Sequence, residues 1–225
     1  MLVLVLILKH KKDTLYFSLF GGILYFLVDF GYFYYISKSR TVTISGNECN
    51  SFQTGLVLLW MSLSYRITNF AFIWLCIKKD EDLKEILIMI IGWWLIVPTI
   101  SSIGGKNNIV TFRTTSAYHS FMAIMLAIGY GAIIIYNIFS SKEKKIDIIR
   151  LNLIGIGVQF CWEFALLING IRPMNSSSLV TLLINSLIET NLGMPYIYGI
   201  YLLYKKIINK DVNSSETLVI KENIY

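Results

Sequence analysis

Six long apolar runs, separated by short polar segments, dominate this sequence of 225 residues. They span residues 15–37, 55–77, 86–103, 117–139, 151–170 and 178–204. A helix of about 20 apolar residues is long enough to cross the hydrocarbon core of a bilayer. Backbone groups in lipid must be hydrogen-bonded within the protein, and we find no strand-like alternation, so each run should be helical. The pattern predicts an all-α, polytopic transmembrane bundle of six to seven helices.

Composition leaves little room for anything outside this bundle. Hydrophobic residues make up 55% of the chain and charged residues only 15%, against about 25% charged residues in a typical soluble domain. We expect an N-terminal stub at 1–14, the bundle at 15–204 and a polar, flexible cytoplasmic tail at 205–225. Residues 1–8 are apolar but too short to cross a membrane and unlike a cleavable signal peptide. They could form an interfacial stub, a frayed end or the remnant of an upstream helix.

The distribution of basic residues predicts the orientation. Of the 20 Lys and Arg residues, 14 lie in the N-terminal segment, the second and fourth loops and the tail, whereas five lie in the other three loops. Because loops rich in Lys and Arg stay cytoplasmic, both termini should be cytoplasmic. The membrane itself could be a bacterial inner membrane or a eukaryotic endomembrane. The basic residues punctuate apolar runs without forming a patch, so nucleic-acid binding is not expected.

Four charged residues fall inside the apolar runs, where each costs at least about 2.5 kcal/mol near the bilayer centre. They are Asp29, Arg66, Glu163 and Glu189. At ~1.5 Å per residue, they lie about 10–16 Å below the outer ends of their helices. Their similar depth suggests a common cavity that opens toward the outer half of the membrane.

Helical spacing places further polar residues on the same faces as these charges. The groups are Ser62, Arg66 and Asn69; Asn152, Gln159 and Glu163; and Asn185 and Glu189. One interpretation is structural: Arg66 pairs with Asp29 or Glu163, and the amides join helices. The counts argue against this as a complete account, because three carboxylates face one arginine. An acid without a cationic partner stays protonated in such surroundings and could act as a general acid.

No sequence motif indicates a metal or another cofactor, and we expect neither. Cys49, Cys76 and Cys161 are scattered, and His10 and His119 are the only histidines. Aromatic residues are abundant. The tyrosines lie mostly near the ends of the runs, as in an interfacial belt. Trp162, next to Glu163, could instead line a pocket and stabilise a cation with its ring face.

Two stretches carry a resemblance to a known family. They are Gln159-Phe-Cys-Trp-Glu163 and Asn185-Ser-Leu-Ile-Glu189-Thr-Asn191-Leu-Gly193-Met-Pro195. With the helix count, they resemble the small integral-membrane terpene cyclases of meroterpenoid and indole-diterpene pathways. That resemblance implies an intramembrane carboxylic acid that protonates a lipophilic (epoxy)prenyl substrate, after which the cation closes rings without any metal. It covers chiefly the last 50 or so residues.

The resemblance also implies roles for individual residues. Glu189 matches the acid of the family's last helix and would be the proton donor. The family's second acid lies on an early helix, where this chain's second run has none, so Asp29 or Glu163 would take that role. We expect the substrate to contact a further set of side chains: Trp162, Asn185, Asn191, Arg66 and Gln159.

Two other functions remain open from the sequence. Intramembrane acids and helices interrupted by Gly and Pro also suit a proton-coupled transporter, although we find no internal repeat. A non-catalytic membrane scaffold would use the same polar residues to join helices. The oligomeric state is not predicted.

Overall fold

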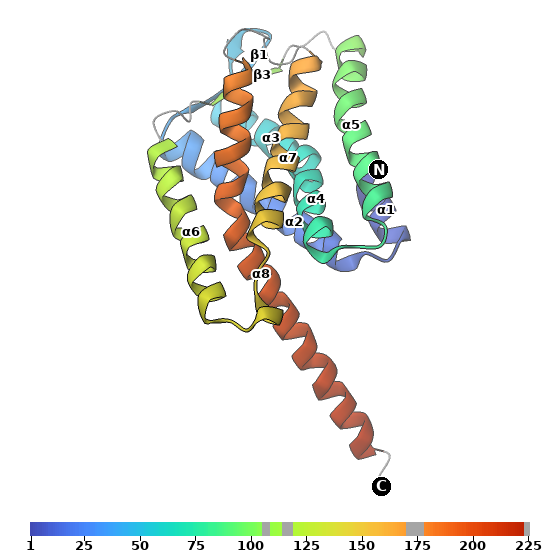
Figure 1. The fold of residues 1–225 in the computed structure, drawn as a ribbon. Helices are drawn as coiled ribbons and strands as arrows, with labels where there is room; N and C mark the ends of the chain where they lie inside the picture. Colours follow the sequence, from blue (N-terminus) through green and yellow to red (C-terminus); the bar gives the residue numbers. More distant parts are fainter. Residues whose placement is uncertain (105–108, 114–118, 170–177, 223–225) are drawn as a thin grey trace.

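The computed structural model describes residues 1–104, 109–113, 119–169 and 178–222 (Figure 1). The chain is mostly helical, as predicted, and each of the six apolar runs coincides with a helical segment over most of its described length. The first run forms α2 (Lys12–Phe26) and the π-helix η1 (Leu27–Ile36). The second forms α3 (Ser51–Met61), the π-helix η2 (Ser62–Arg66) and α4 (Ile67–Lys78). The remaining four form α5 (Leu83–Gly104), α6 (His119–Phe139), α7 (Ile148–Ile168) and α8 (Ser178–Glu222).

Four helical segments of the described chain are long and apolar enough to cross a membrane. They are Lys12–Ile36, Ser51–Lys78, Ser120–Phe139 and Lys142–Ile168. Their outward surfaces carry many exposed large apolar side chains, for example Ile124, Ile128 and Phe139 on α6. Such a surface is unfavourable in water but matches lipid tails. By their length and composition, these four segments could therefore span a membrane.

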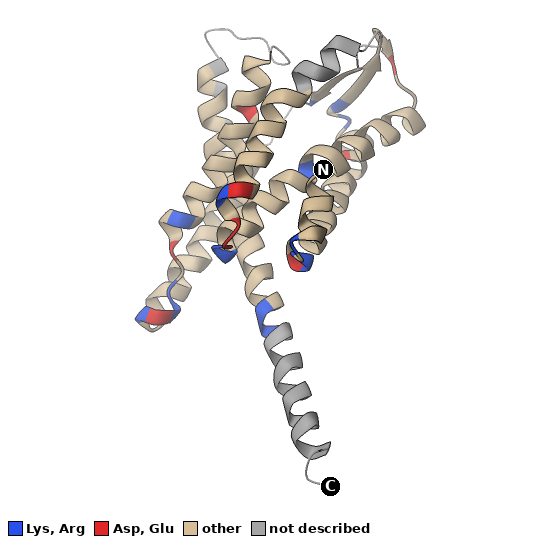
Figure 2. Cartoon of the chain, turned by 90° about the vertical axis from the view of Figure 1, so that its right-hand side faces the viewer, with Lys and Arg blue, Asp and Glu red and all other residues tan. Residues whose placement is uncertain are grey.

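The segments rich in Lys and Arg, which the sequence predicts to be cytoplasmic, gather at one end of the bundle (Figure 2). The N-terminal lysines, the turn between α4 and α5 and the loop between α6 and α7 lie at that end, and α8 leaves the bundle there. The loop between α6 and α7 contains a short 3-10 helix, η4 (Lys142–Lys144). The backbone of α8 stays helical through Glu222, so the predicted tail begins within this helix.

A small antiparallel sheet lies at the opposite end of the bundle (Figure 1). Its strands are β1 (Arg40–Ile44), β2 (Asn47–Glu48) and β3 (Ile109–Arg113), in the order β2-β1-β3. A two-residue turn joins β1 to β2, with φ of 50° at Ser45 and 84° at Gly46, and such backbone angles match the twist of a hairpin. The expectation that strand-like alternation is absent is therefore wrong for the loop that contains β1 and β2 and for the loop that contains β3. The predominantly helical class is confirmed.

The N-terminal stub is a short helix, α1 (Leu2–Leu8), that packs against the bundle. Leu6 is fully buried, and Leu2 lies in the same core cluster as Ile67 and Ile90. Residues 1–8 therefore contribute to the hydrophobic core rather than fraying from it.

An ion-pair cluster connects the turn after α1 to the turn before α5. Lys9 lies 2.6 Å from Asp82, and Lys11 lies 2.8 Å from Asp80 and 2.9 Å from Asp82. The hydrogen bonds from Lys9 and Lys11 hold the pKa of Asp82 below its ordinary value of 3.8. Because the side chains of Lys9 and Asp82 are 33% and 24% exposed, their ion pair contributes modestly to stability.

We expect this cluster to make folding stability depend on pH in the acid range. The folded state has the lower Asp82 pKa, so the contribution is complete above a pH of about 4 and is lost as the pH falls through the folded pKa. Thermal unfolding of the detergent-solubilised protein between a pH of about 6 and about 3 measures this. Asp82→Asn should lose less folding stability over that interval than the wild type does. The same pH profile in the variant and the wild type would show that Asp82 does not cause the pH dependence.

Candidate functional site

The buried carboxylate of Asp29 is paired with two arginines from the sheet. Its Oδ2 lies 3.1 Å from Arg40 Nη2, and its Oδ1 lies 3.5 Å from Arg113 Nη1. Asp29 is only 3% exposed and Arg40 is 8% exposed. Arg113 also stacks its guanidinium over the Phe33 ring, 4.8 Å from the centroid.

A third arginine joins this group through a tyrosine. Arg66 Nη2 donates a hydrogen bond of 2.8 Å to the Tyr25 hydroxyl, and Arg113 Nη1 donates one of 2.7 Å to the same oxygen. The Arg66 guanidinium lies over the Tyr25 ring, 3.9 Å from its centroid. We call Tyr25, Asp29, Arg40, Arg66 and Arg113 the arginine cluster.

Local backbone geometry explains how these residues meet. The register of the sheet places Arg40 directly opposite Arg113 on neighbouring strands, where like charges repel. Asp29 lies in the π-helix η1 and Arg66 in the π-helix η2. A π-helix changes the direction in which the residues of a helix project, and such segments are frequent at functional sites. Asp29 and Arg66, the two charged members of the cluster that lie in the apolar runs, thus occupy irregular helix.

The electrostatics of Arg40 reflect this crowding. Burial lowers the pKa of Arg40, Asp29 opposes that effect, and the nearby Arg113 and Arg66 lower the pKa further. The Arg40 Nε has no hydrogen-bond partner among the described residues. The cluster thus holds three guanidinium groups, and Asp29 forms ion pairs with two of them, those of Arg40 and Arg113.

This geometry corrects the charge count made from the sequence. Arg66 bonds to Tyr25 and does not pair with Asp29 or Glu163, and Asp29 takes its cationic partners from Arg40 and Arg113. Asp29 is therefore not a surplus acid. In the sequence, Arg40 and Arg113 fall in the loops between apolar runs, and only the pairing of β1 with β3 shows that they lie together.

The polar stripe of α7 is confirmed at Gln159 and Glu163. Gln159 Nε2 donates a hydrogen bond of 3.2 Å to Glu163 Oε1, and Thr190 of α8 donates one of 2.8 Å to Gln159 Oε1. Both α7 side chains are 4% exposed. The carboxyl group of Glu163 is thus held inside the bundle at the contact between α7 and α8.

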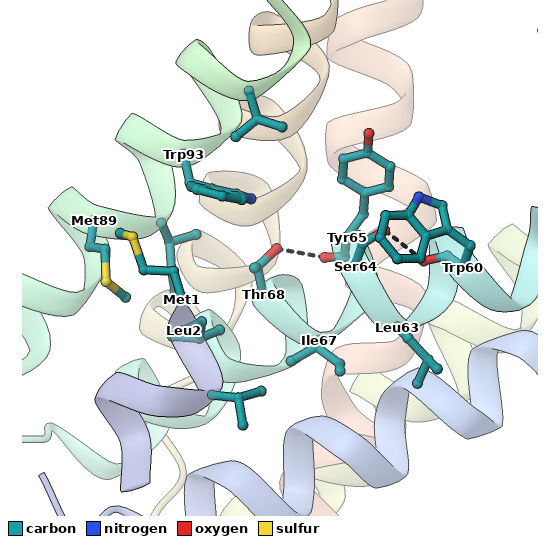
Figure 3. A pocket seen from close by; sticks show the side chains of 13 residues that line it. Met1, Leu2, Trp60, Leu63, Ser64, Tyr65, Ile67, Thr68, Met89 and Trp93 are labelled. Atoms are coloured by element: carbon teal, nitrogen blue, oxygen red, sulfur yellow. Dashed lines mark hydrogen bonds between the residues drawn. The ribbon is translucent and has the colours of Figure 1, made fainter. Parts of the chain in front are cut away.

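A cavity of about 380 Å³ opens between α1, the helical segment Ser51–Lys78 and α5 (Figure 3). Its walls are mostly apolar and aromatic, with Trp60, Tyr65 and Trp93 among its lining residues and the hydroxyls of Ser64 and Thr68 as polar groups. Such a composition suits a lipophilic ligand. Three of the four charged residues expected to share a cavity, Asp29, Arg66 and Glu163, do not line this one.

Trp162 connects this cavity to the polar stripe of α7. Its ring lies 5.0 Å from that of Tyr65, a lining residue, and packs edge-on against Trp94 at 5.7 Å. Trp94 Nε1 in turn donates a hydrogen bond of 2.8 Å to the hydroxyl of Thr68. Trp162 therefore lies behind the cavity wall, one residue before Glu163.

Asn191 lies in the contact between helices rather than in this cavity. It is fully buried, its Oδ1 accepts a hydrogen bond of 3.3 Å from the Tyr130 hydroxyl of α6, and its Nδ2 donates to the Ser186 carbonyl. The side chains of Asn185, Glu189 and His119 lie outside the described part of the structure, although their backbones belong to α8 and α6.

Among the described residues, no group of three or more His, Cys, Asp or Glu side chains is placed to hold a metal ion. Comparisons with known protein families, with curated proteins and with solved structures find no match. The function must therefore be argued from the geometry of the site itself.

Proposed function

We propose that the chain crosses the membrane six times, with both termini on the cytoplasmic side. The four apolar helical segments and the apolar lengths of α5 and α8 support this count. The gathering of the basic segments at one end of the bundle supports the orientation. The sheet and the arginine cluster would then lie at the outer end.

Within this topology, we propose an integral membrane enzyme that cyclises a lipophilic (epoxy)prenyl substrate by protonating it. The observation that carries the proposal is the position of Glu163. Its buried carboxyl group lies one residue after Trp162, whose ring backs the aromatic wall of the cavity. The cavity would hold the isoprenoid chain, and the surrounding bilayer would supply it.

The chemistry uses only groups of this chain. A carboxylic acid gives its proton to an epoxide oxygen or an alkene carbon, and the resulting carbocation closes rings by attack of neighbouring double bonds. Loss of a proton to a basic group ends the reaction and leaves product and substrate isomeric. The Trp and Tyr ring faces at the cavity stabilise the cation. Glu163 and Glu189, on the closely packed α7 and α8, are the proposed acids, whereas we assign Asp29 to charge balance with its two arginines.

The test is the product formed by isolated membranes supplied with epoxy-prenyl substrates. We expect Glu163→Gln to lower the yield of cyclised product by about 100-fold or more, because positioned general acids contribute about 10²–10⁴-fold to rates. Glu189→Gln should have a comparable effect.

Glu143→Gln is the matched control, because Glu143 is exposed in the loop before α7. Its yield should equal that of the wild type. Full activity of both Glu163→Gln and Glu189→Gln, with the proteins present at wild-type levels, would eliminate the acid mechanism.

A proton-coupled transporter is the second candidate, because a buried carboxyl group in a bundle core is also typical of proton carriers. Substrate flux into proteoliposomes that depends on a pH gradient, together with no change in substrate mass spectrum or connectivity, would favour it over catalysis.

A further inference from the structure

The cavity beside α1 reaches the outer surface of the bundle between two tryptophans. Of its lining residues, Trp60 is 70% exposed and Trp93 is 39% exposed. Trp60 lies nine residues after Ser51, and Trp93 lies ten residues after Leu83, so each is about 14–15 Å from the nearer end of its helical segment. In the proposed topology this is the middle of a hydrocarbon core about 30 Å thick. The opening of the cavity therefore faces lipid tails.

The two small hydroxyl groups of the cavity wall spend their hydrogens on the backbone. Ser64 Oγ donates a hydrogen bond of 2.6 Å to the Trp60 carbonyl, and Thr68 Oγ1 donates one of 2.5 Å to the Tyr65 carbonyl. The Thr68 oxygen also accepts from Trp94 Nε1. Because a hydroxyl group has a single hydrogen to donate, neither Ser64 nor Thr68 has one left for a ligand.

The donors that remain free come from the aromatic side chains of the wall. The hydroxyl of Tyr65 and the indole N–H groups of Trp60 and Trp93 have no acceptor among the described residues. Tyr65 is half-buried, and Figure 3 shows the indole nitrogen of Trp93 directed toward the side of the cavity that Tyr65 forms. An N–H or O–H group left unpaired in apolar surroundings is costly, so these donors favour a ligand that brings an acceptor.

The wall also restricts the charge and the size of a ligand. No side chain that lines the cavity is charged, and an unpaired charge is very costly to bury in apolar surroundings. The volume of about 380 Å³ falls within the range of about 300–1,000 Å³ that is typical of small-molecule sites. The cavity is thus suited to an uncharged, mostly apolar molecule that carries a hydrogen-bond acceptor.

We propose that the cavity binds an uncharged lipophile with one hydrogen-bond-accepting oxygen, such as an ether, epoxide or carbonyl oxygen, and that Tyr65 and Trp93 donate to this oxygen. The ligand enters sideways from the bilayer, past Trp60 and Trp93. This inference rests on the proposed function for the depth of the cavity in the membrane, and it names the part of the substrate that the cavity recognises. Binding involves no covalent step, so it can be measured apart from cyclisation.

Saturated probes keep the test independent of the acid mechanism, because a chain with no double bond or epoxide gives an acid nothing to cyclise. The competitors are dodecyl methyl ether and tetradecane, whose chains have the same length and differ in the ether oxygen. Both compete with a dodecyl ether that carries a diazirine and labels the protein in phosphatidylcholine nanodiscs on illumination. Mass spectrometry of the labelled peptides then locates and quantifies the bound label.

In the wild type, the ether should displace the label at a concentration at least about fivefold lower than tetradecane does, because the hydrocarbon leaves the donors unpaired. Tyr65→Phe should reduce this ratio at least about twofold, since one hydrogen bond is lost. The variant with both Tyr65→Phe and Trp93→Phe should bring the ratio close to one. Comparison of ratios between variants cancels any difference in how the competitors partition into the bilayer.

Tyr16→Phe is the matched control, because it removes the same hydroxyl group from an exposed tyrosine of α2 that does not line the cavity. Its ratio should equal that of the wild type. Dodecyl phosphate, which has the same chain and a charged group, should displace the label poorly. Displacement as strong as that by the ether would contradict an uncharged ligand.

Equal displacement by the ether and by tetradecane in the wild type would overturn the inference without reliance on any variant. A ratio that Tyr65→Phe and Trp93→Phe both leave unchanged would also overturn it. If Tyr65→Phe does not fold, Trp93→Phe alone tests the site. Failure of the proposed cyclase is a separate result: Glu163→Gln and Glu189→Gln would then keep full activity, while the preference of the cavity for the ether would be unaffected.

Discussion

Replacement of Gly155 by alanine is expected to lower the melting temperature of the protein by about 4–8 °C, because adding atoms to a full interface costs about 1–3 kcal/mol. Gly155 is buried on α7 and faces α8. A Cβ at this position would overlap the Asn191 side-chain oxygen and lie 2.8 Å from Met194 Cγ. Both neighbours are fully buried, so neither side chain can move into open space. Close approach of helices at small residues is a general feature of packing in membranes.

Gly157 provides a control on the same helix, two residues further along. No atom lies within 4 Å of a Cβ built there. Gly157→Ala should therefore leave the melting temperature unchanged or raise it, since alanine favours helix over glycine by about 1 kcal/mol. Thermal unfolding in a single detergent, followed by circular dichroism, compares the two variants. Equal melting temperatures for Gly155→Ala and Gly157→Ala would show that the contact between α7 and α8 is looser than its geometry indicates.

The sequence was sufficient to predict the helices, because the length of an apolar run and the need to satisfy backbone groups in lipid are local properties. It was also sufficient for the contact between Gln159 and Glu163, since residues four apart meet on one helix face. It identified Asp29 and Arg66 as buried charges that require partners. Each of these inferences depends on neighbours along the chain.

The partners of those charges could not be predicted, because they are set by contacts between distant segments. Arg40 and Arg113 lie in different loops and meet only through the register of β1 with β3. The Ser45-Gly46 turn is a local hairpin signal that could have revealed β1 and β2, but β3 follows two helical segments later. The π-helical backbone at Asp29 and Arg66 likewise has no simple sequence signature. The arginine cluster was therefore missed, although four of its five members are charged residues.

Asp29→Asn is expected to destabilise the protein more than any other single change in the cluster. The substitution keeps the size of the side chain and removes the charge that separates Arg40 from Arg113. Loss of one partner from a buried ion pair costs about 3–5 kcal/mol, so the melting temperature should fall by about 10 °C. Asp13→Asn removes a partly exposed partner of Lys78 and should cost at most about 1 kcal/mol.

A double variant tests whether Asp29 stabilises the protein by balancing the charges of Arg40 and Arg113. Arg40→Gln combined with Asp29→Asn should be more stable than Asp29→Asn alone, because the repulsion between Arg40 and Arg113 is then absent. If Asp29→Asn melts at the wild-type temperature, the carboxylate is not needed to balance the arginines.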